Sequence, residues 1–298
     1  MNNNFHKGLI LTSLGSFWWG FVGVIYFEMV TFIGHIELVV HRCLWTAVML
    51  IITTFFLKKW KIFIKTISNK KNLIYLFVSG LLIFINWAIW IYAVATNRII
   101  DASFGYFIMP IISVLLGYIF FKEKLNQKRI FSILLVFASI FFMIFLNIKT
   151  LPWVGLIVAL SWAFYNLVRK KINVDTDIGL LIESLYIFPF ALVVFYFIFS
   201  KGFNDFSLDN IGLSLFLLLA GPMTVIPLFL YVRGVELIGL GATGMIFYIT
   251  PTLQFILGYF YYNEDFSLIK LVSFVIIWTY QIKFNCFTSR FRSNFKKH

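Results

Sequence analysis

Charged residues are scarce in this chain of 298 residues: they make up 12% of it, whereas hydrophobic residues make up 61%. A soluble domain is about a quarter charged and about half apolar, so this composition cannot cover a folded surface that faces water. The mean hydropathy of +0.92 agrees with that conclusion. The composition therefore predicts an integral membrane protein whose partner is the lipid bilayer.

Residues that bind metals or carry out catalysis are also few. The two cysteines, Cys43 and Cys286, lie far apart in apolar segments, and the four histidines form no cluster with a carboxylate. We therefore expect no disulfide framework, no metal site and no cofactor. The sequence also has no phosphate-binding glycine loop. These absences argue against an enzyme.

The net charge of +13 comes from short basic clusters between apolar runs rather than from a basic domain, so nucleic acid is not a predicted partner. Of the 25 Lys and Arg residues, Arg98, Lys149, Lys201 and Lys270 fall in one set of alternate segments and Arg42 lies inside a run. The remaining 20 fall in the other set. The positive-inside rule therefore predicts that both termini are cytoplasmic.

Long apolar runs fill most of the chain. A helix needs about 20 residues to cross a bilayer core about 30 Å thick, and a membrane β-strand needs only about ten alternating residues. The sequence therefore predicts an all-α membrane fold with ten transmembrane helices. The predicted helices are 7–27, 36–57, 72–95, 102–121, 129–147, 152–170, 178–199, 209–232, 242–262 and 268–286.

Part of the chain nearly repeats itself at an offset of 141 residues, the separation of Pro110 from Pro251. The matched pairs are Pro110 with Pro251, Leu116 with Leu257, Gly117 with Gly258, Tyr118 with Tyr259, Glu123 with Glu264 and Ser132 with Ser273. Because each unit holds an odd number of helices, the second unit enters the membrane from the opposite face. We expect two inverted five-helix repeats at 1–148 and 149–298, which together form one membrane domain. Transporters built from such repeats bind solute between them.

Two ionisable residues, Arg42 and Glu183, lie clearly inside apolar runs, and the same offset makes them equivalent. Intramembrane charges are functional by default. Helix rise puts each roughly 9 Å from opposite membrane faces, so together they can hold an anionic or zwitterionic solute. A buried Glu183 is also the candidate for proton coupling. The competing interpretation is that Arg42 snorkels to the interface or caps carbonyls and that Glu183 is protonated or bonds within its own half.

Prolines are predicted to break several helices. Pro110 and Pro251 are expected in the middle of two helices, where a proline removes a backbone hydrogen bond and kinks the helix. Pro222 and Pro227 flank Thr224 in a further segment that we expect to be broken. A carbonyl freed by a kink needs a partner or a water-filled cavity. These kinks are therefore expected to act as hinges beside the solute.

Polar and aromatic side chains gather near these prolines and in the neighbouring helices. Asn86 and Trp90, for example, share one helix face. The predicted solute-binding residues are His41, Arg42, Asn86, Trp90, Tyr106, Tyr165, Glu183, Thr224, Tyr248 and Gln254. The competing interpretation is that the prolines only shape packing and that Trp and Tyr form the aromatic belt at the membrane interface.

Several motifs resemble those of RarD proteins, within the EamA family of the drug/metabolite transporter superfamily, and they follow the same order through nearly the whole chain. They are His41-Arg42-Cys43-Leu44-Trp45, Asn86-Trp87, Ala102-Ser103-Phe104-Gly105-Tyr106-Phe107, Gly221-Pro222-Met223-Thr224 and Tyr248-Ile249-Thr250-Pro251-Thr252-Leu253-Gln254-Phe255. The resemblance implies a bacterial inner-membrane protein of ten helices in two inverted halves. It also implies transport of small metabolites or drugs, without naming a substrate.

The expected function is secondary active transport of a small polar or amphipathic metabolite or drug by alternating access, with a proton as the candidate coupling ion. The alternative is a membrane protein that transports nothing. It would be either a scaffold subunit or an enzyme acting on a lipid-linked substrate. A scaffold would not need Arg42 and Glu183, and an enzyme would need a reactive pair that the sequence does not contain.

Overall fold

The computed structural model describes residues 3–122 and 153–264, together with positions 127, 130, 131, 134, 138, 272 and 275. Apart from those single positions, the predicted helices 129–147 and 268–286 lie outside the described residues. The elements are α1 (Asn3–Phe17), η1 (Trp18–Val22), α2 (Gly23–Met29), η2 (Thr31–Ile33), α3 (His35–Phe56), α4 (Trp60–Ile67), α5 (Lys70–Ala95), α6 (Ile99–Phe121), α8 (Trp153–Lys170), α9 (Thr176–Ser200), α10 (Ile211–Leu218), α11 (Ala220–Ile246) and α12 (Ile249–Phe260).

Six segments of the described chain are helices long and apolar enough to cross a membrane. They are Asn4–Met29, His35–Phe56, Lys70–Ala95, Ile99–Phe121, Thr176–Ser200 and Ile211–Gly234. All six coincide with predicted helices. The predicted helix 152–170 is the shorter α8, and the predicted helix 242–262 is divided between the end of α11 and α12. The described residues therefore support an all-helical membrane protein.

The outer surface of these helices is apolar. Between 39% and 56% of each spanning window is buried inside the protein, and large side chains such as Phe190 and Phe197 of α9 remain exposed. In hydrocarbon a helix satisfies its own backbone hydrogen bonds, which explains why the apolar runs form helices. The exposed rings are suited to contact lipid.

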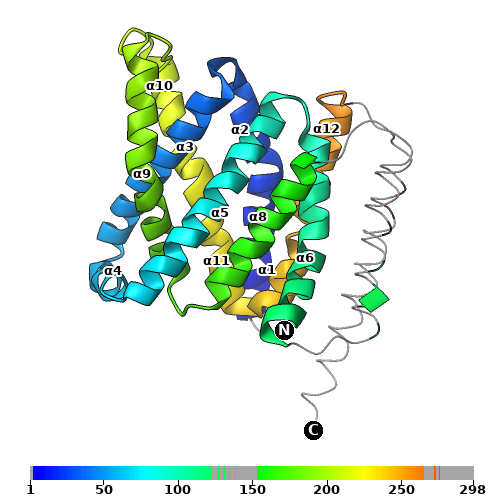
Figure 1. Cartoon of the computed structure of the whole chain (residues 1–298). Helices are drawn as coiled ribbons and strands as arrows, with labels where there is room; N and C mark the ends of the chain where they lie inside the picture. The colour runs from blue at the N-terminus through cyan, green and yellow to red at the C-terminus, as the bar shows by residue number, and fades with distance from the viewer. Residues whose placement is uncertain are drawn as a thin grey trace.

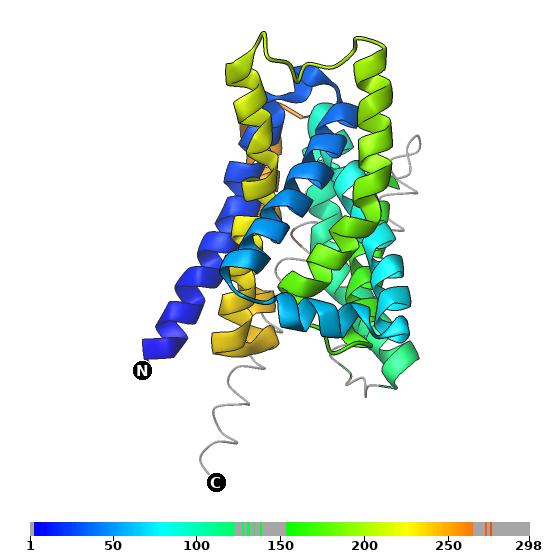
Figure 2. The same ribbon diagram turned by 90° about the vertical axis from the view of Figure 1, so that its left-hand side faces the viewer.

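The long helices stand side by side, while the short helix α4 lies across one end of them (Figure 1, Figure 2). We call this the α4 end, and we call the opposite end, which carries the segment 201–210 between α9 and α10, the loop end. The principal pairs in contact are α1 with α11, α6 with α8, α5 with α8, α3 with α9 and α3 with α11. Helices from the two predicted halves therefore interleave.

The crossing of α6 and α8 is unusually close. A side chain at Gly105 of α6 would meet the backbone carbonyl of Gly155 of α8, and one at Gly155 would meet the carbonyl of Asp101. The α1–α11 contact is similar, because a Cβ at Gly15 would lie 2.9 Å from the carbonyl oxygen of Pro227. Small residues allow membrane helices to approach this closely.

The helices are interrupted at several points. The five residues Trp18–Val22 form a turn of π-helix inside the first spanning segment, a feature that often accompanies functional sites. Leu219 separates α10 from α11. The rings of Tyr231 and Phe247 lie 5.7 Å apart, although a straight helix would separate those positions by about 24 Å. The chain therefore turns back within α11.

The four predicted proline hinges occupy different settings. Pro251 was expected in mid-helix but lies in the first turn of α12, and Pro222 lies in the first turn of α11, where a missing N–H is no loss. The carbonyl of Phe247, which a residue other than proline at 251 would bond, accepts instead from the N–H of Thr250 at 2.9 Å. Pro227 lies inside α11, and α6 continues through position 110.

Candidate functional site

Arg42 is buried against three aromatic rings. It lies on α3 and is 7% exposed. Its guanidinium carbon is 4.8 Å from the ring centroid of Trp87, 5.1 Å from that of Phe27 and 5.4 Å from that of Trp90. Trp87 and Trp90 come from α5 and Phe27 from α2. Ring faces attract a cation at this range, so the three rings, which we call the aromatic cage, hold the guanidinium away from lipid.

The edge of the same guanidinium has unsatisfied donors. Its Nε and Nη1 groups are buried and have no hydrogen-bond partner in the described part of the chain. Nor does any carboxylate of residues 3–122 or 153–264 form an ion pair with it. A buried charge without a counterion is costly, and such a group calls for an explanation.

Asn86 connects three helices beside the aromatic cage. Its side-chain amide donates to the carbonyl of Val158 and to the hydroxyl of Ser161, both at 3.1 Å, and its oxygen accepts from the hydroxyl of Tyr106 at 3.3 Å. Asn86 is on α5, Tyr106 on α6, and the other two on α8. Satisfied buried networks of this kind fix the positions of their members. Asn86 therefore positions Tyr106.

Aromatic rings continue from Tyr106 toward the second half of the chain. The ring of Tyr106 lies 6.2 Å from that of Trp162 and 6.3 Å from that of Phe247. Trp162 lies 5.7 Å from Tyr165, and Phe247 lies 6.2 Å from Trp19. Of the predicted binding residues, Arg42, Asn86, Trp90, Tyr106 and Tyr165 thus belong to one continuous set of contacts.

Glu183 terminates this set at the α4 end, and it has partners. It is fully buried, accepts a hydrogen bond from the hydroxyl of Ser79 and accepts another from the hydroxyl of Tyr165 at 3.2 Å. Nη1 of Arg169 lies 3.6 Å from the same carboxylate. The prediction treated Arg42 and Glu183 as two free charges facing one solute. Of the two, only Arg42 lacks a hydrogen-bond or ion-pair partner among the described residues.

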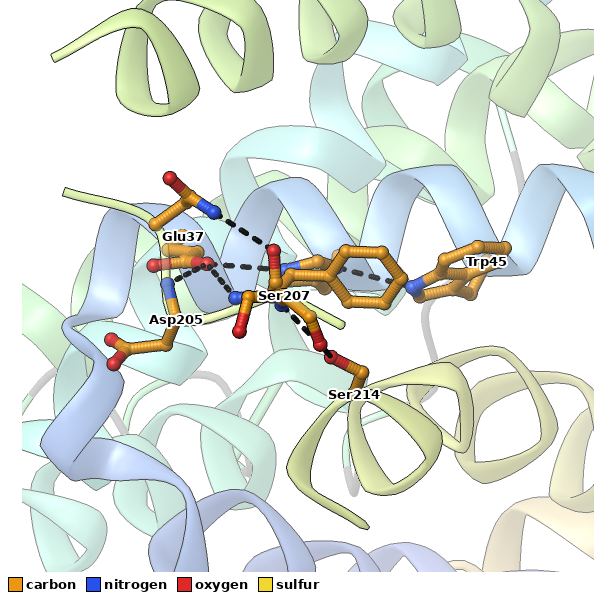
Figure 3. Close-up of polar contacts among 8 residues, drawn as sticks. Glu37, Trp45, Asp205, Ser207 and Ser214 are labelled. Atoms are coloured by element: carbon orange, nitrogen blue, oxygen red, sulfur yellow. Dashed lines mark hydrogen bonds and ion pairs between the residues drawn. The ribbon is translucent and has the colours of Figure 1, made fainter. Parts of the chain in front are cut away.

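His41 faces the loop end rather than the aromatic cage. Its Nδ1 accepts from the indole N–H of Trp45 at 3.1 Å, so its Nε2 carries the proton and donates to Glu37 at 3.3 Å. Glu37 also accepts from the backbone N–H groups of Asp205 at 3.1 Å and Phe206 at 3.4 Å (Figure 3). Glu37, His41 and Trp45, which we call the Glu37 cluster, therefore bind the segment 201–210 to α3.

The segment 201–210 is also bonded to the first turn of α10, which contains Ser214. The hydroxyl of Ser214 accepts from the N–H of Ser207 at 3.0 Å and donates to its carbonyl at 2.7 Å (Figure 3). Phe206 packs 5.2 Å from the ring of His41 and 5.9 Å from that of Trp45. Burial and the nearby charge of Glu37 both raise the pKa of Asp205. The contact is therefore weakest when Asp205 is ionised.

An ion-pair cluster lies at the α4 end. Nζ of Lys59, between α3 and α4, is 2.6 Å from the carboxylate of Asp177 and 3.7 Å from that of Asp175. Burial alone would lower the pKa of Lys59, but the hydrogen bond and charge of Asp177, aided by Asp175, raise it. The pair is therefore fully formed at neutral pH.

The remaining predicted residues lie elsewhere. Thr224 donates to the carbonyl of Ala220 within α11 at 3.0 Å, Tyr248 stacks on Phe107 at 6.0 Å, and Gln254 is buried with an unpartnered Oε1 among the described residues. No hydrogen bond, ion pair or ring contact joins these three to Arg42 in the described part of the chain. Tyr248 and Gln254 belong instead to the packing of α12.

Several contacting residues were absent from the sequence-based set. Phe27 and Trp87 complete the aromatic cage, and Ser79 and Arg169 complete the surroundings of Glu183. One signal could have found Arg169, because it lies four residues after Tyr165 on the same face of α8. Phe27 had no such signal, since it meets Arg42 only through tertiary packing.

Comparison with known proteins assigns two segments, residues 6–145 and 151–279, to the EamA-like transporter family. The chain is 34% identical over 295 residues to "Uncharacterized transporter YojE" of Bacillus subtilis, covering 98% of each chain. It is 30% identical over 272 residues to "Protein RarD" of Escherichia coli, covering 91% of each chain. It is 23% identical over 259 residues to "Chloramphenicol-sensitive protein RarD" of Pseudomonas aeruginosa, covering 85% of each chain. With both segments matched along a multi-pass, apolar helical chain, this protein belongs to the EamA-like transporter family.

Proposed function

We propose that this membrane transporter is a secondary active transporter that moves a small polar or amphipathic metabolite or drug by alternating access. The observation that carries the proposal is the buried, unpartnered guanidinium of Arg42 in its aromatic cage. A membrane protein that needed only to fold would be better served by an apolar residue there. A solute that binds Arg42 supplies the missing partner.

The two predicted halves, 1–148 and 149–298, are the proposed repeat units, in inverted orientation. The packing supports this because contacts between the halves recur when each helix is replaced by its equivalent in the other half. The contact of α1 with α11 corresponds to that of α8 with α5, and the contact of α6 with α8 corresponds to that of α12 with η1. The two matched family segments have similar bounds. The helices α3 and α9 are equivalent to each other under the proposed repeat and are also in contact. Arg42 and Glu183 lie at the same distance along the chain from the starts of these two helices.

Alternating access requires contacts that close each end in turn, and both ends have contacts between the halves. At the loop end, Glu37 binds the backbone of the segment 201–210, and Glu264 accepts from the first backbone N–H groups of α6. At the α4 end, Lys59 pairs with Asp177 and Ser79 donates to Glu183. Opening either end would break one of these sets while leaving the other intact.

The α4 end is the proposed cytoplasmic end, in a bacterial inner membrane, because basic residues concentrate there. Glu183 is the proposed site of proton coupling. Its carboxylate is buried beside Arg169, Ser79 and Tyr165, so taking up or losing a proton would alter contacts between α5, α8 and α9. Such a change could link protonation to opening of the α4 end.

The test is transport by the purified protein in proteoliposomes, with an imposed proton gradient. Radiolabelled amino acids, nucleosides, amphenicols and small organic acids would be offered to wild type, to Arg42→Ala and to empty vesicles. We expect at least one solute to accumulate in wild-type vesicles alone. Equal uptake by wild-type and empty vesicles across the whole panel would refute the proposal.

A further inference from the structure

We propose, resting on the proposed function, that the solute is a monocarboxylate with an apolar or aromatic body and no ammonium group. Its carboxylate would accept from the guanidinium edge of Arg42, while its body would pack against the aromatic cage. This narrows the class of solute from any small metabolite to a small organic anion.

The charge of the solute follows from what surrounds Arg42. The guanidinium carries one positive charge, and the described carboxylates form no ion pair with it. A monoanion would make the site neutral, whereas a phosphate dianion would leave one negative charge uncompensated in the membrane, where burial of net charge is costly. Charge-assisted hydrogen bonds between arginine and a carboxylate are also among the strongest available in proteins.

A solute with an ammonium group would need a second, negative partner. The described carboxylate equivalent to Arg42 under the repeat is Glu183, and it is already bonded to Ser79, Tyr165 and Arg169. Glu37 accepts at Oε1 from His41 and from backbone N–H groups, whereas its Oε2 is buried without a partner among the described residues. Glu37 shares a face of α3 with His41, and this face meets the segment 201–210 rather than the aromatic cage. An ammonium group beside Arg42 would therefore have to displace the bonds of Glu183 or lie away from the cage to reach Glu37, while a simple carboxylate would need neither.

The remaining donors and the rings fit the rest of the solute. Thr46 lies one helical turn beyond Arg42 on the same face of α3, is fully buried, and has a hydroxyl without a partner in the described chain. This hydroxyl is a second donor for a carboxylate. The rings of Phe27, Trp87 and Trp90 are buried around the charge, and the ring of Tyr106 lies in the same buried cluster as Phe27 and Trp90, so the surroundings of the guanidinium are apolar. An aromatic or branched aliphatic acid would use both.

The experiment measures ligand-induced thermal shifts and tryptophan quenching with the full chain in nanodiscs. The probes are benzoate, phenylacetate and hexanoate, each compared with its neutral amide, and phenylalanine and inorganic phosphate. Because Trp87 and Trp90 form the cage, a carboxylate bound there should quench tryptophan fluorescence. The comparison of acid with amide is made on wild type, so it does not depend on the folding of any variant.

The variants are Arg42→Met and the matched control Arg98→Met. Arg98 also lies over a tryptophan, with its guanidinium carbon 5.2 Å from the ring of Trp153, but it is paired with Asp101 at 2.8 Å. We expect at least one carboxylate to bind wild type and Arg98→Met, with affinity on the order of 10-fold to 100-fold lower in Arg42→Met. The amides should bind as weakly to wild type as to Arg42→Met.

Four outcomes would overturn the inference: equal binding of acid and amide, tighter binding of phenylalanine or phosphate, unchanged carboxylate affinity in Arg42→Met, or no binding of any of the three acids. Failure here is distinct from failure of the proposed function. Transport of a neutral or zwitterionic solute would support the proposed transport function and refute the inference that the solute is a monocarboxylate. Binding of a carboxylate that never crosses the vesicle membrane would support the inference about the ligand and refute the proposed transport function.

Discussion

Replacing Arg42 with methionine should make the empty protein more stable. The substitution keeps an unbranched, apolar side chain among Phe27, Trp87 and Trp90 but removes the charge and the two unpartnered N–H groups. The lost cation–π attraction is about 0.5–2 kcal/mol for the nearest ring, that of Trp87, and smaller for the two more distant rings. The recovered penalty of leaving a buried charge unpaired is several kcal/mol, and apolar replacement even of paired buried ions is often neutral or stabilises by about 1–4 kcal/mol.

The assay is thermal unfolding of the purified protein in detergent, followed by intrinsic fluorescence, without added anions. A gain of this size corresponds to a rise in apparent Tm of roughly 2–8 °C for a chain of this length. Arg98→Met is the control, because it removes a guanidinium that is paired with Asp101 and should lower the apparent Tm slightly. A stabilised Arg42→Met protein that no longer transports would show that the charge is kept for function.

The reasoning is refuted if Arg42→Met lowers the apparent Tm by more than Arg98→Met does. That result would mean that the guanidinium is stabilised by its surroundings without a solute. It would also remove the physical basis for treating Arg42 as the anchor of the solute.

Glu183→Gln should abolish proton-driven accumulation in proteoliposomes while preserving solute exchange at equal pH; if the variant accumulates solute as wild type does, Glu183 does not couple. Glu37→Ala removes the acceptor for two backbone N–H groups, so amide exchange of the segment 201–210 should become at least tenfold faster, and unchanged exchange would contradict the role of the Glu37 cluster. The raised pKa of Asp205 means that its carboxyl group holds a proton more tightly in the folded state than in the unfolded chain. The stability contributed is present at acid pH and lost as pH rises through the folded pKa, a dependence that Asp205→Asn should flatten in exchange measurements. Lys59→Met should lower the apparent Tm at pH 7 and have less effect above the raised pKa of Lys59, where the wild-type pair is itself lost; an equal difference at both pH values would argue against the ion pair.

Apolar run length predicted most of the membrane helices, because crossing a bilayer imposes a length that the sequence records directly. It could not predict the π-helical turn at Trp18–Val22 or the break at Leu219, since the hydropathy of those residues is continuous. The helix α4 was not predicted, because its lysines interrupt the apolar sequence and are typical of a basic loop.

For the site, the rarity of intramembrane charge was enough to select Arg42 and Glu183. What differs between them is their partners. Ser79 and Arg169 reach Glu183 from α5 and α8, and Phe27 reaches Arg42 from α2. Contacts between distant helices depend on crossing geometry, which neither spacing nor composition encodes. His41 illustrates the same limit, because its neighbour in sequence faces the cage while its own ring bonds Glu37.

The close crossing of α6 and α8 at Gly105 and Gly155 restricts which helices can move relative to each other. Where two backbones touch with no side chain between them, sliding by even a fraction of a helical turn would drive carbonyls into neighbouring atoms. We therefore expect α6 and α8 to move as one unit, and α1 and α11 as another, although each unit takes one helix from each half of the chain. The moving units would then differ from the predicted halves, because α1 would move with a helix of the second half and α8 with a helix of the first.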